Sequence, residues 1–131
     1  ITGMFNQGKV GIIFNGPWFF GEVAPDLDVG IAPLPRLDAA GGTPLKPWMT
    51  VEGLFISARS PRQDAAMELA RFLTTPEVAR IMALEGRQLP ALAAVYDDPD
   101  VAADPILSGF RIQAESAVPS PNLAVMTLLW A

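Results

Sequence analysis

The chain has 131 residues, half of them hydrophobic, and a formal net charge of −5 at pH 7. This length suffices for one small domain with a core, and interspersed charges of this balance exclude the electrostatic footprint of a nucleic-acid or anionic-membrane binder. Cysteine and histidine are absent, which argues against thiol nucleophiles, imidazole bases, structural zinc and haem, so we expect no cofactor and no metal.

The first elements are a helix end and a short apolar strand. Ile1–Gln7 is typical of the end of a helix, with Gly8 as the residue that terminates it. Val10–Phe14 is short and apolar enough to be a strand buried on both faces. Asn15 and Gly16 follow, and both tolerate the positive φ that ends a strand abruptly.

A tryptophan follows this strand directly. Because proline suits the first position of a helix, we predict a short helix over Pro17–Val23. Trp18 would then lie just beyond the carboxyl end of a buried strand, where open α/β sheets bind their ligands. Val29–Pro35 predicts a second strand whose prolines suit an edge or an end, and Arg36–Pro47 predicts an exposed loop.

The character of the sequence changes at Val51. Gly53–Ser57 predicts a further apolar strand. Ser60 and Gln63 have the spacing of a capping box that opens a helix, with Pro61 at its first position. The helix carries an apolar stripe at helical spacing, formed by Ala65, Ala66, Leu69, Phe72 and Leu73.

Helices dominate the remaining residues. Thr75-Pro76-Glu77 begins a helix that we expect to end at Gly86 and to bury Val78, Ile81 and Met82. The other predicted elements, in order, are a short helix at Ala91–Tyr96, an acidic turn at Asp97–Asp104, a helix at Pro105–Glu115 with Ile106, Phe110 and Ala114 on one face, a loop at Val118–Pro121, and a helix at Leu123–Trp130 with Asn122 as its N-cap. This pattern indicates one small α/β domain or pieces of two lobes.

Three tryptophans are candidates for a binding platform. A tryptophan chosen at random is more often part of a core. Trp18 and Trp130, however, each belong to a short predicted helix that follows a turn signal, so their rings can point out of the sheet ends. Trp48 lies in a proline-rich loop, where it packs locally or is exposed. From these residues alone, each tryptophan could belong to the hydrophobic core or form a binding platform.

Catalytic and metal-binding patterns are poor. The spacing of the carboxylates, Glu22 and Glu52 among them, makes no general acid–base pair. The acidic run Asp97–Asp104 lacks the glycine and the final glutamate of a calcium loop. The glycines fit neither dinucleotide-binding nor P-loop spacing, and the serines have no candidate base. We therefore predict that the protein is not an enzyme.

Several motifs, in their order and spacing, resemble one family. Gly8-Lys9-Val10 through Asn15-Gly16-Pro17-Trp18 resembles the Gly-Lys/Glu-x-Ala-Met-x-x-Asn-Gly-Pro-Trp segment of extracellular solute-binding proteins of the maltose-binding type. The motifs that follow in the same order are Val29–Pro35, Lys46-Pro47, Ser60-Pro61, Ala70–Leu73, Thr75-Pro76-Glu77, Leu89-Pro90-Ala91, and Pro121-Asn122 nine residues before Trp130. The resemblance covers essentially the whole chain.

The resemblance implies an α/β fold that is part of a two-lobed periplasmic-binding-protein type II structure, with the chain crossing between lobes. It implies that residues 1–47 belong to the carboxyl-terminal lobe, that residues 48–104 return to the amino-terminal lobe, and that residues 105–131 form a second, truncated part of the carboxyl-terminal lobe. The change of character at Val51 agrees with such a crossing.

The same resemblance implies the substrate-binding component of an ABC-type sugar importer. Such a protein binds maltose, maltodextrin or a related oligosaccharide between its lobes and delivers it to a membrane permease. The sugar-stacking positions correspond to Trp18 and Trp130, because an aromatic ring buries the apolar C–H face of a pyranose. Glu52, near the crossover, is implied as a hydroxyl acceptor, and Met126 as a further ligand-binding position.

The implied location is periplasmic or extracellular, with a lipid anchor as one option. The alternative is a stand-alone α/β interaction module without a sugar site, whose tryptophans are core. Because the chain opens at Ile1 without a leader pattern and stops at Ala131 within an apolar run, we expect a piece of a longer protein. Its apolar lobe surfaces would then favour self-association or strand exchange.

Overall fold

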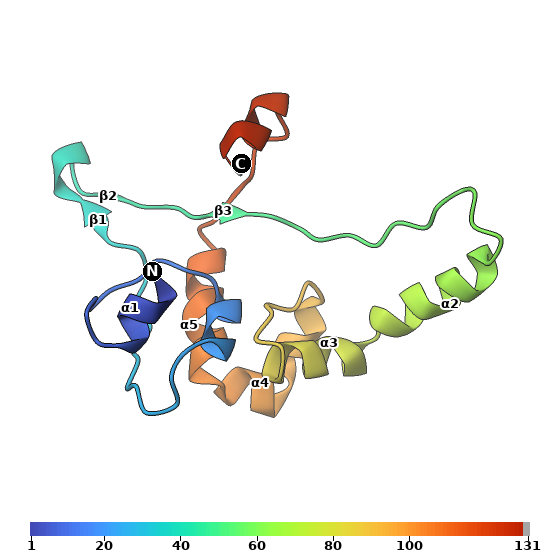
Figure 1. Ribbon diagram of the computed structural model, residues 1–131, viewed down its shortest axis with the longest axis horizontal. Coiled ribbons are helices and arrows are strands. Elements are labelled where there is room, and N and C mark those ends of the chain that lie inside the picture. The colour runs from blue at the N-terminus through green and yellow to red at the C-terminus, as the bar shows by residue number, and fades with distance from the viewer. Residues whose placement is uncertain (130–131) are drawn as a thin grey trace.

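The computed structural model describes residues 1–129, and most of its packing is concentrated around a group of helices (Figure 1). The core is formed by α3 (Pro76–Leu84), a 3-10 turn η3 (Ala93–Asp97), α4 (Pro99–Ala103) and α5 (Pro105–Ala114). One buried side chain from each of these elements meets in the centre: Ala83, Val95, Val101 and Leu107. Among the described residues, no helix is both long and apolar enough to cross a membrane.

The amino-terminal part forms a second, smaller packing unit. Helix α1 (Thr2–Asn6) and the 3-10 helix η1 (Pro17–Gly21) meet through Phe5 and Phe19, whose rings lie edge to face with centroids 5.7 Å apart. The Asn6 amide completes the contact: its Nδ2 donates to the carbonyl of Glu22 at 2.7 Å, and its Oδ1 accepts from Ala24 N–H at 3.2 Å. The predicted end of α1 is confirmed, since Gly8 follows it with a φ of +68°.

Helix α5 joins this unit to the helical core. Phe110 packs edge to face on Phe20, with ring centroids 6.3 Å apart. One turn further along α5, Gln113 Oε1 accepts a hydrogen bond from Leu34 N–H at 2.7 Å. Residues 20 and 34 therefore both lie against α5, although they precede their partners on it by 90 and 79 positions in the chain.

The strands of the structure are short. β1 (Arg36–Leu37) pairs with β2 (Thr43–Pro44) in an antiparallel ladder, joined through the 3-10 turn η2 (Asp38–Ala40). β3 (Trp48–Met49) pairs with β4 (Val118–Pro119) in a parallel ladder. The 3-10 helix η4 (Ala124–Leu129) follows β4, and α2 (Gln63–Leu73) follows a long extended segment after β3 (Figure 1).

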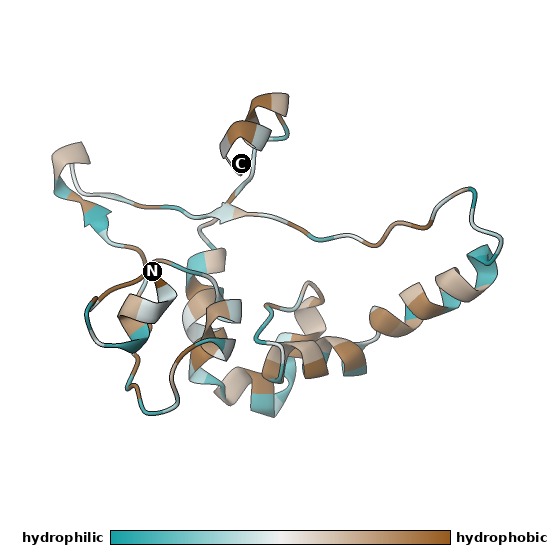
Figure 2. Ribbon diagram, in the orientation of Figure 1, coloured by the Kyte–Doolittle hydropathy of each residue, from teal (hydrophilic) through white to brown (hydrophobic). Residues whose placement is uncertain are grey.

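Three predicted strands are absent from the described residues. Val10–Phe14, Val29–Pro35 and Gly53–Ser57 have no ladder partner within residues 1–129 and run as irregular backbone. The prediction that Val10–Phe14 is buried on both faces is wrong here, since the Phe14 side chain is 68% exposed. A strand requires neighbours for its backbone groups, and these apolar segments lie along open chain instead (Figure 2).

The helix predictions are largely confirmed, but their buried faces are not. α2, α3 and α5 form where predicted, and the acidic turn Asp97–Asp104 turns out to contain α4. α2 begins at Gln63 rather than at Pro61, and the Gln63 amide donates to the carbonyl of Ala58 at 2.7 Å instead of completing a capping box. The α2 stripe is not buried, and α3 buries Ala83 while Ile81 and Met82 are exposed.

Leu107 provides a test of the helical core. Its side chain is 1% exposed and belongs to the buried cluster with the other three core residues. We expect Leu107→Ala to lower the free energy of unfolding by about 2–4 kcal/mol, because it removes buried methyl groups and leaves a cavity. Urea unfolding followed by circular dichroism measures the change. Leu123→Ala, at an exposed position, is the control and should shift stability by less than about 0.5 kcal/mol; equal shifts in the two variants would contradict the described core.

Candidate functional site

Trp18 is the predicted platform residue that the structure presents most clearly. The 3-10 helix η1 buries Pro17 and Phe19 on its inner side and leaves the Trp18 side chain 57% exposed. A ring anchored by two buried neighbours and open on one side is suited to stack on a flat apolar ligand surface. The prediction that the ring points outward agrees with this geometry.

The structure gives a different reason for glycine at position 16 from the one that the sequence suggested. The sequence predicted a positive φ at Asn15 or Gly16, and neither has one: Gly16 has φ −95° and ψ 175°, an extended conformation that any residue adopts. Instead, the six-membered ring of Trp18 lies directly against Gly16. The side chain of Asn15 accepts a hydrogen bond from Gly16 N–H at 2.9 Å and fixes the backbone there.

The other predicted sugar-binding residues are distributed over separate segments. Glu52 is exposed on the segment that follows β3, and Met126 is half-buried in η4, which follows β4. Trp130 lies outside the described residues. The β3–β4 ladder brings the segments of Glu52 and Met126 side by side at one point, where Val118 N–H donates to the carbonyl of Pro47 at 3.0 Å. Within residues 1–129, no backbone hydrogen bond joins Trp18 to Glu52 or Met126.

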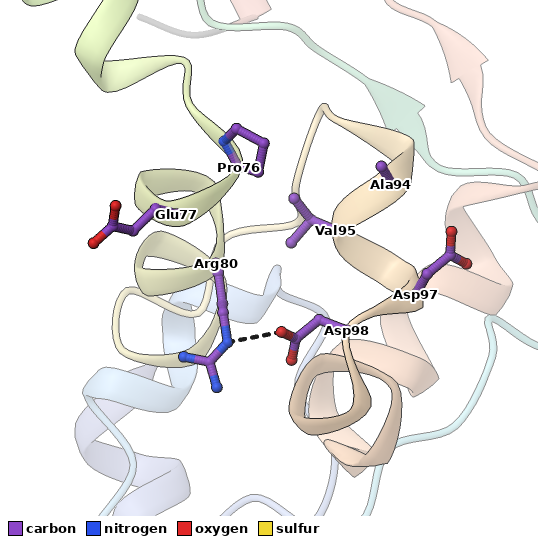
Figure 3. Close-up of a pocket in the computed structure, with 7 residues that line it drawn as sticks. All are labelled: Pro76, Glu77, Arg80, Ala94, Val95, Asp97 and Asp98. Carbon is purple, nitrogen blue, oxygen red and sulfur yellow. Dashed lines mark hydrogen bonds and ion pairs between the residues drawn. The ribbon is translucent and has the colours of Figure 1, made fainter.

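Among the described residues, the helical unit carries hollows on its surface, and neither of the two described below includes a predicted sugar-binding residue. The first, of about 360 Å³, opens between α3 and η3 and is lined by Pro76, Glu77, Arg80, Ala94, Val95, Asp97 and Asp98 (Figure 3). The second, of about 240 Å³, lies beside α4 and α5, where the Arg111 guanidinium stands 4.6 Å over the ring of Tyr96. Burial raises the pKa of Tyr96, and Arg111 opposes that rise.

The charged groups of the first hollow are already paired. Arg80 Nε donates to Asp98 at 2.9 Å, and Arg80 also binds Asp100. Asp98 in turn accepts the N–H groups of residues 100 and 101, which makes it the N-cap of α4. Burial raises the pKa of Asp98, but the Val101 N–H and Arg80 outweigh it, so the pKa is lowered. The arrangement stabilises a helix and offers no nucleophile with an adjacent base.

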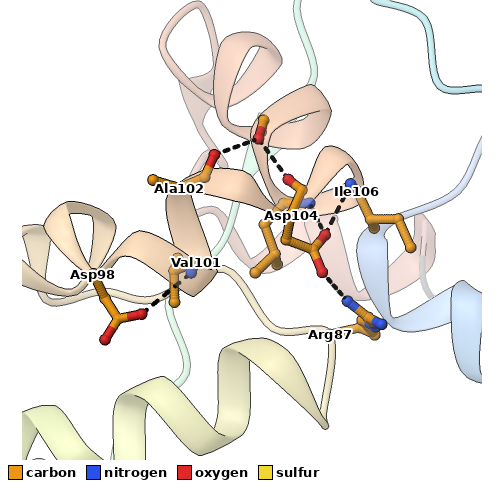
Figure 4. Close-up of polar contacts among 8 residues, drawn as sticks. Arg87, Asp98, Val101, Ala102, Asp104 and Ile106 are labelled. Atoms are coloured by element: carbon orange, nitrogen blue, oxygen red, sulfur yellow. Dashed lines mark hydrogen bonds and ion pairs between the residues drawn. The ribbon is translucent and has the colours of Figure 1, made fainter.

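Asp104 repeats this arrangement one element later. Its Oδ1 accepts from Ile106 N–H at 2.9 Å and Leu107 N–H at 3.0 Å, while Oδ2 binds Arg87 (Figure 4). Burial raises the pKa of Asp104, but the Leu107 N–H and Arg87 together outweigh it, so the pKa of this carboxyl is lowered.

Sequence reasoning missed both caps. The signal was present, since Asp98-Pro99 and Asp104-Pro105 each place a capping residue before a proline at the first helical position. Within residues 1–129, moreover, no three acidic side chains are grouped so as to hold a metal ion.

Residues 1–109 match the model of the bacterial extracellular solute-binding protein family, and the chain therefore belongs to that family. The family is one of solute-binding proteins rather than of enzymes, and its description calls its members extracellular.

Individual relatives agree with the family match. The chain is 33% identical, over 97% of its length, to the maltotriose-binding protein of Pyrococcus abyssi, and 26% identical, over 99% of its length, to the galactooligosaccharide-binding protein of Bacillus subtilis. These alignments cover 29% and 31% of the two relatives, so the chain spans less than a third of the length of the curated proteins it matches.

A solved structure shows the same fold. The maltose-maltodextrin binding protein of the thermoacidophilic bacterium Alicyclobacillus acidocaldarius superposes on 98% of the chain with a TM-score of 0.86 and 29% sequence identity, over 35% of its own length. This match confirms the predicted fold class, an α/β part of a two-lobed periplasmic-binding-protein type II fold.

Asp104 allows a test of the cap and the ion pair separately. Because its pKa is lowered in the folded chain, the ionised carboxylate stabilises the fold above the unfolded-state pKa of about 4, and this stabilisation is lost as the pH falls through the folded pKa. Asparagine keeps the cap but not the charge. We expect Asp104→Ala to lower stability by about 1–2 kcal/mol at pH 7 and Asp104→Asn to lower it less.

Urea midpoints measured from pH 7 down to pH 3 check this expectation. The deficit of Asp104→Asn should shrink below about pH 4, where the carboxyl of the unfolded wild-type chain becomes protonated and the stabilisation by the folded-state charge begins to be lost. Asp97→Asn, at an exposed carboxylate on the rim of the first hollow, is the matched control. A pH-independent deficit for Asp104→Asn would contradict a stabilising role of the charge.

Proposed function

We propose that the chain is part of the substrate-binding component of an ABC-type sugar importer. The ligand is maltose, a maltodextrin or a related oligosaccharide, which the protein binds between two lobes and delivers to a membrane permease. The relatives whose names include maltotriose and galactooligosaccharide support this ligand class. The observation that carries the proposal is the outward-facing ring of Trp18 at the Asn15-Gly16-Pro17-Trp18 turn.

The chemistry of the ligand fits such a ring. A pyranose presents a face of C–H groups that an aromatic ring covers, while its hydroxyls remain available to polar partners. Trp18 supplies the stacking surface, and Trp130 is proposed as a second one. Glu52, exposed after β3, is proposed as a hydroxyl acceptor, and Met126 as an apolar contact.

We propose the following division into lobes. Residues 1–47 and 105–131 form parts of the carboxyl-terminal lobe, and residues 48–104 form a return into the amino-terminal lobe. Two contacts across the sequence support the first grouping: the Phe20–Phe110 ring pair and the hydrogen bond from Leu34 to Gln113. The parallel β3–β4 ladder supports the proposal that two segments which cross between the lobes lie side by side there.

The protein works in this proposal by binding and closure, without chemical conversion and without a cofactor. Its partners are the sugar and the permease, and no nucleic acid is involved. Its location is periplasmic or extracellular, with a lipid anchor as one form of attachment. The alternative, a stand-alone interaction module with core tryptophans, has less support, because Trp18 and Trp48 are both exposed.

Removing the platform tests the proposal. In the whole binding protein, we expect Trp18→Ala to weaken oligosaccharide binding by about 1–3 kcal/mol, because a stacking aromatic is lost, and Trp18→Phe to retain part of the affinity. Titration calorimetry with maltose, maltotriose, longer maltodextrins and galactooligosaccharides measures the change. Phe72→Ala, which alters an aromatic side chain of matching exposure on α2 (58% against 57%), is the control. Unchanged affinity of Trp18→Ala for every sugar that the wild type binds would refute the assignment.

The exposed apolar side chains predict self-association of the 131-residue chain. Leu54 and Phe55 lie on the extended segment before α2, with Phe55 95% exposed, and Leu69 and Phe72 are exposed on α2 itself (Figure 2). Burying such surface between copies is favourable. We expect sedimentation velocity to show larger species as concentration rises, and Phe55→Glu with Phe72→Glu to shift the chain toward monomer. A clean monomer at high concentration would exclude this association.

A further inference from the structure

The ring of Trp18 occupies space that any residue other than glycine would fill at position 16. A Cβ atom placed on Gly16 would overlap Cη2 and Cζ3 of Trp18 and stand 2.5 Å from Cζ2. Ordinary van der Waals contact between a Cβ and a neighbouring heavy atom begins near 3.4 Å. The six-membered half of the indole is therefore seated directly on the glycine backbone.

The backbone itself does not require glycine at this position. Gly16 has an extended conformation, whereas Gly8, Gly41 and Gly42 have positive φ angles that favour glycine for conformational reasons. Gly21, at the end of the same 3-10 helix, would accept a Cβ without meeting any atom within 4 Å. At position 16 the need for glycine therefore comes from the close approach of the Trp18 ring and not from the backbone conformation.

The neighbouring residues hold Gly16 in place behind the ring. Asn15 Oδ1 accepts the Gly16 N–H at 2.9 Å, and Pro17 is buried and fixes its own φ. The Gly16 carbonyl accepts a hydrogen bond from Phe19 N–H at 3.1 Å, and the Phe19 ring is anchored on Phe5. The support under the Trp18 ring is therefore tied to the helix at both its N–H and its carbonyl.

We propose that Gly16 is a positioning residue that sets the orientation of the Trp18 ring for sugar stacking. The Gly16 backbone supports one part of the indole, and the exposed remainder of the ring is left for the pyranose. This inference rests on the proposed function, because it assigns the ring a sugar ligand. A methyl group at position 16 displaces an exposed side chain that is free to swing toward solvent, so it changes ring orientation while the rest of the fold is preserved.

The first experiment observes the ring without any sugar. In the 131-residue chain, Trp48→Phe with Trp130→Phe leaves Trp18 as the sole tryptophan. We expect Gly16→Ala in this background to give a red-shifted emission maximum and a larger acrylamide quenching constant, because the indole leaves its support. Gly21→Ala is the matched control and should change neither. Emission and quenching equal to the sole-tryptophan parent would overturn the inference, whatever the sugar results.

The second experiment links ring orientation to binding. In the whole binding protein, we expect Gly16→Ala to weaken maltotriose binding about five- to tenfold, which corresponds to about 1–1.4 kcal/mol, and Gly21→Ala to leave it unchanged. In the Trp18→Ala background, Gly16→Ala should cause no further loss, since the ring it displaces is absent. A loss of the same size in both backgrounds would overturn the positioning role.

The two proposals fail in distinguishable ways. If the whole binding protein binds none of the tested sugars, the proposed function is refuted. If it binds them and Trp18→Ala leaves the affinity unchanged, the stacking assignment and the sugar part of this inference are refuted. If Trp18→Ala weakens binding but Gly16→Ala does not, the stacking assignment stands and only the positioning role is refuted. Circular dichroism and urea midpoints of the Gly16→Ala protein, expected to match those of Gly21→Ala, exclude unfolding as the cause of a loss.

Discussion

The described packing depends on one carboxylate. Asp104 accepts two backbone N–H groups at the start of α5 and binds Arg87, which follows α3, so a single side chain fixes the direction of α5 relative to α3. With that direction set, Leu107 enters the core shared with α3, η3 and α4. The next two turns of α5 then present Phe110 and Gln113 to the amino-terminal unit. The cap therefore supports both the small core and the contact of α5 with the amino-terminal unit.

The sequence predicted helices better than it predicted what they bury. Thr75-Pro76 was recognised as a helix start, and the Thr75 hydroxyl does accept Val78 N–H, at 3.4 Å. The two Asp-Pro pairs carry the same local information but were interpreted by their charge, as an acidic turn. Helix starts are local, so they can be predicted. The buried face is not local: α3 turns Ala83 inward because η3 and α4 lie on that side, and the periodicity of Ile81 and Met82 does not specify a neighbour.

The strand predictions failed because a strand depends on non-local neighbours even more than the buried face of a helix does. Val10–Phe14 and Gly53–Ser57 have strand composition, but a ladder needs a partner backbone, and no segment within residues 1–129 supplies it. The chain covers 35% of the length of the matched structure. Of the candidate site, the outward exposure of Trp18 was predictable from its place after the turn. The relation of Glu52 and Met126 to that ring depends on long-range packing and stays a prediction.

The glycine at position 16 shows how a correct residue can be assigned a wrong cause. Asn-Gly pairs are usually explained by the positive φ of a turn, but the φ of Gly16 is −95°. Here the absence of a Cβ atom allows the Trp18 ring to approach the backbone closely. In the proposed sugar site, this difference would affect binding. A ring supported by backbone that is itself hydrogen-bonded at both ends loses less rotational freedom when a sugar stacks on it than a freely rotating ring would lose. Asn15, Gly16, Pro17 and Trp18 therefore act as one preorganised unit, in which the smallest residue determines where the largest one points.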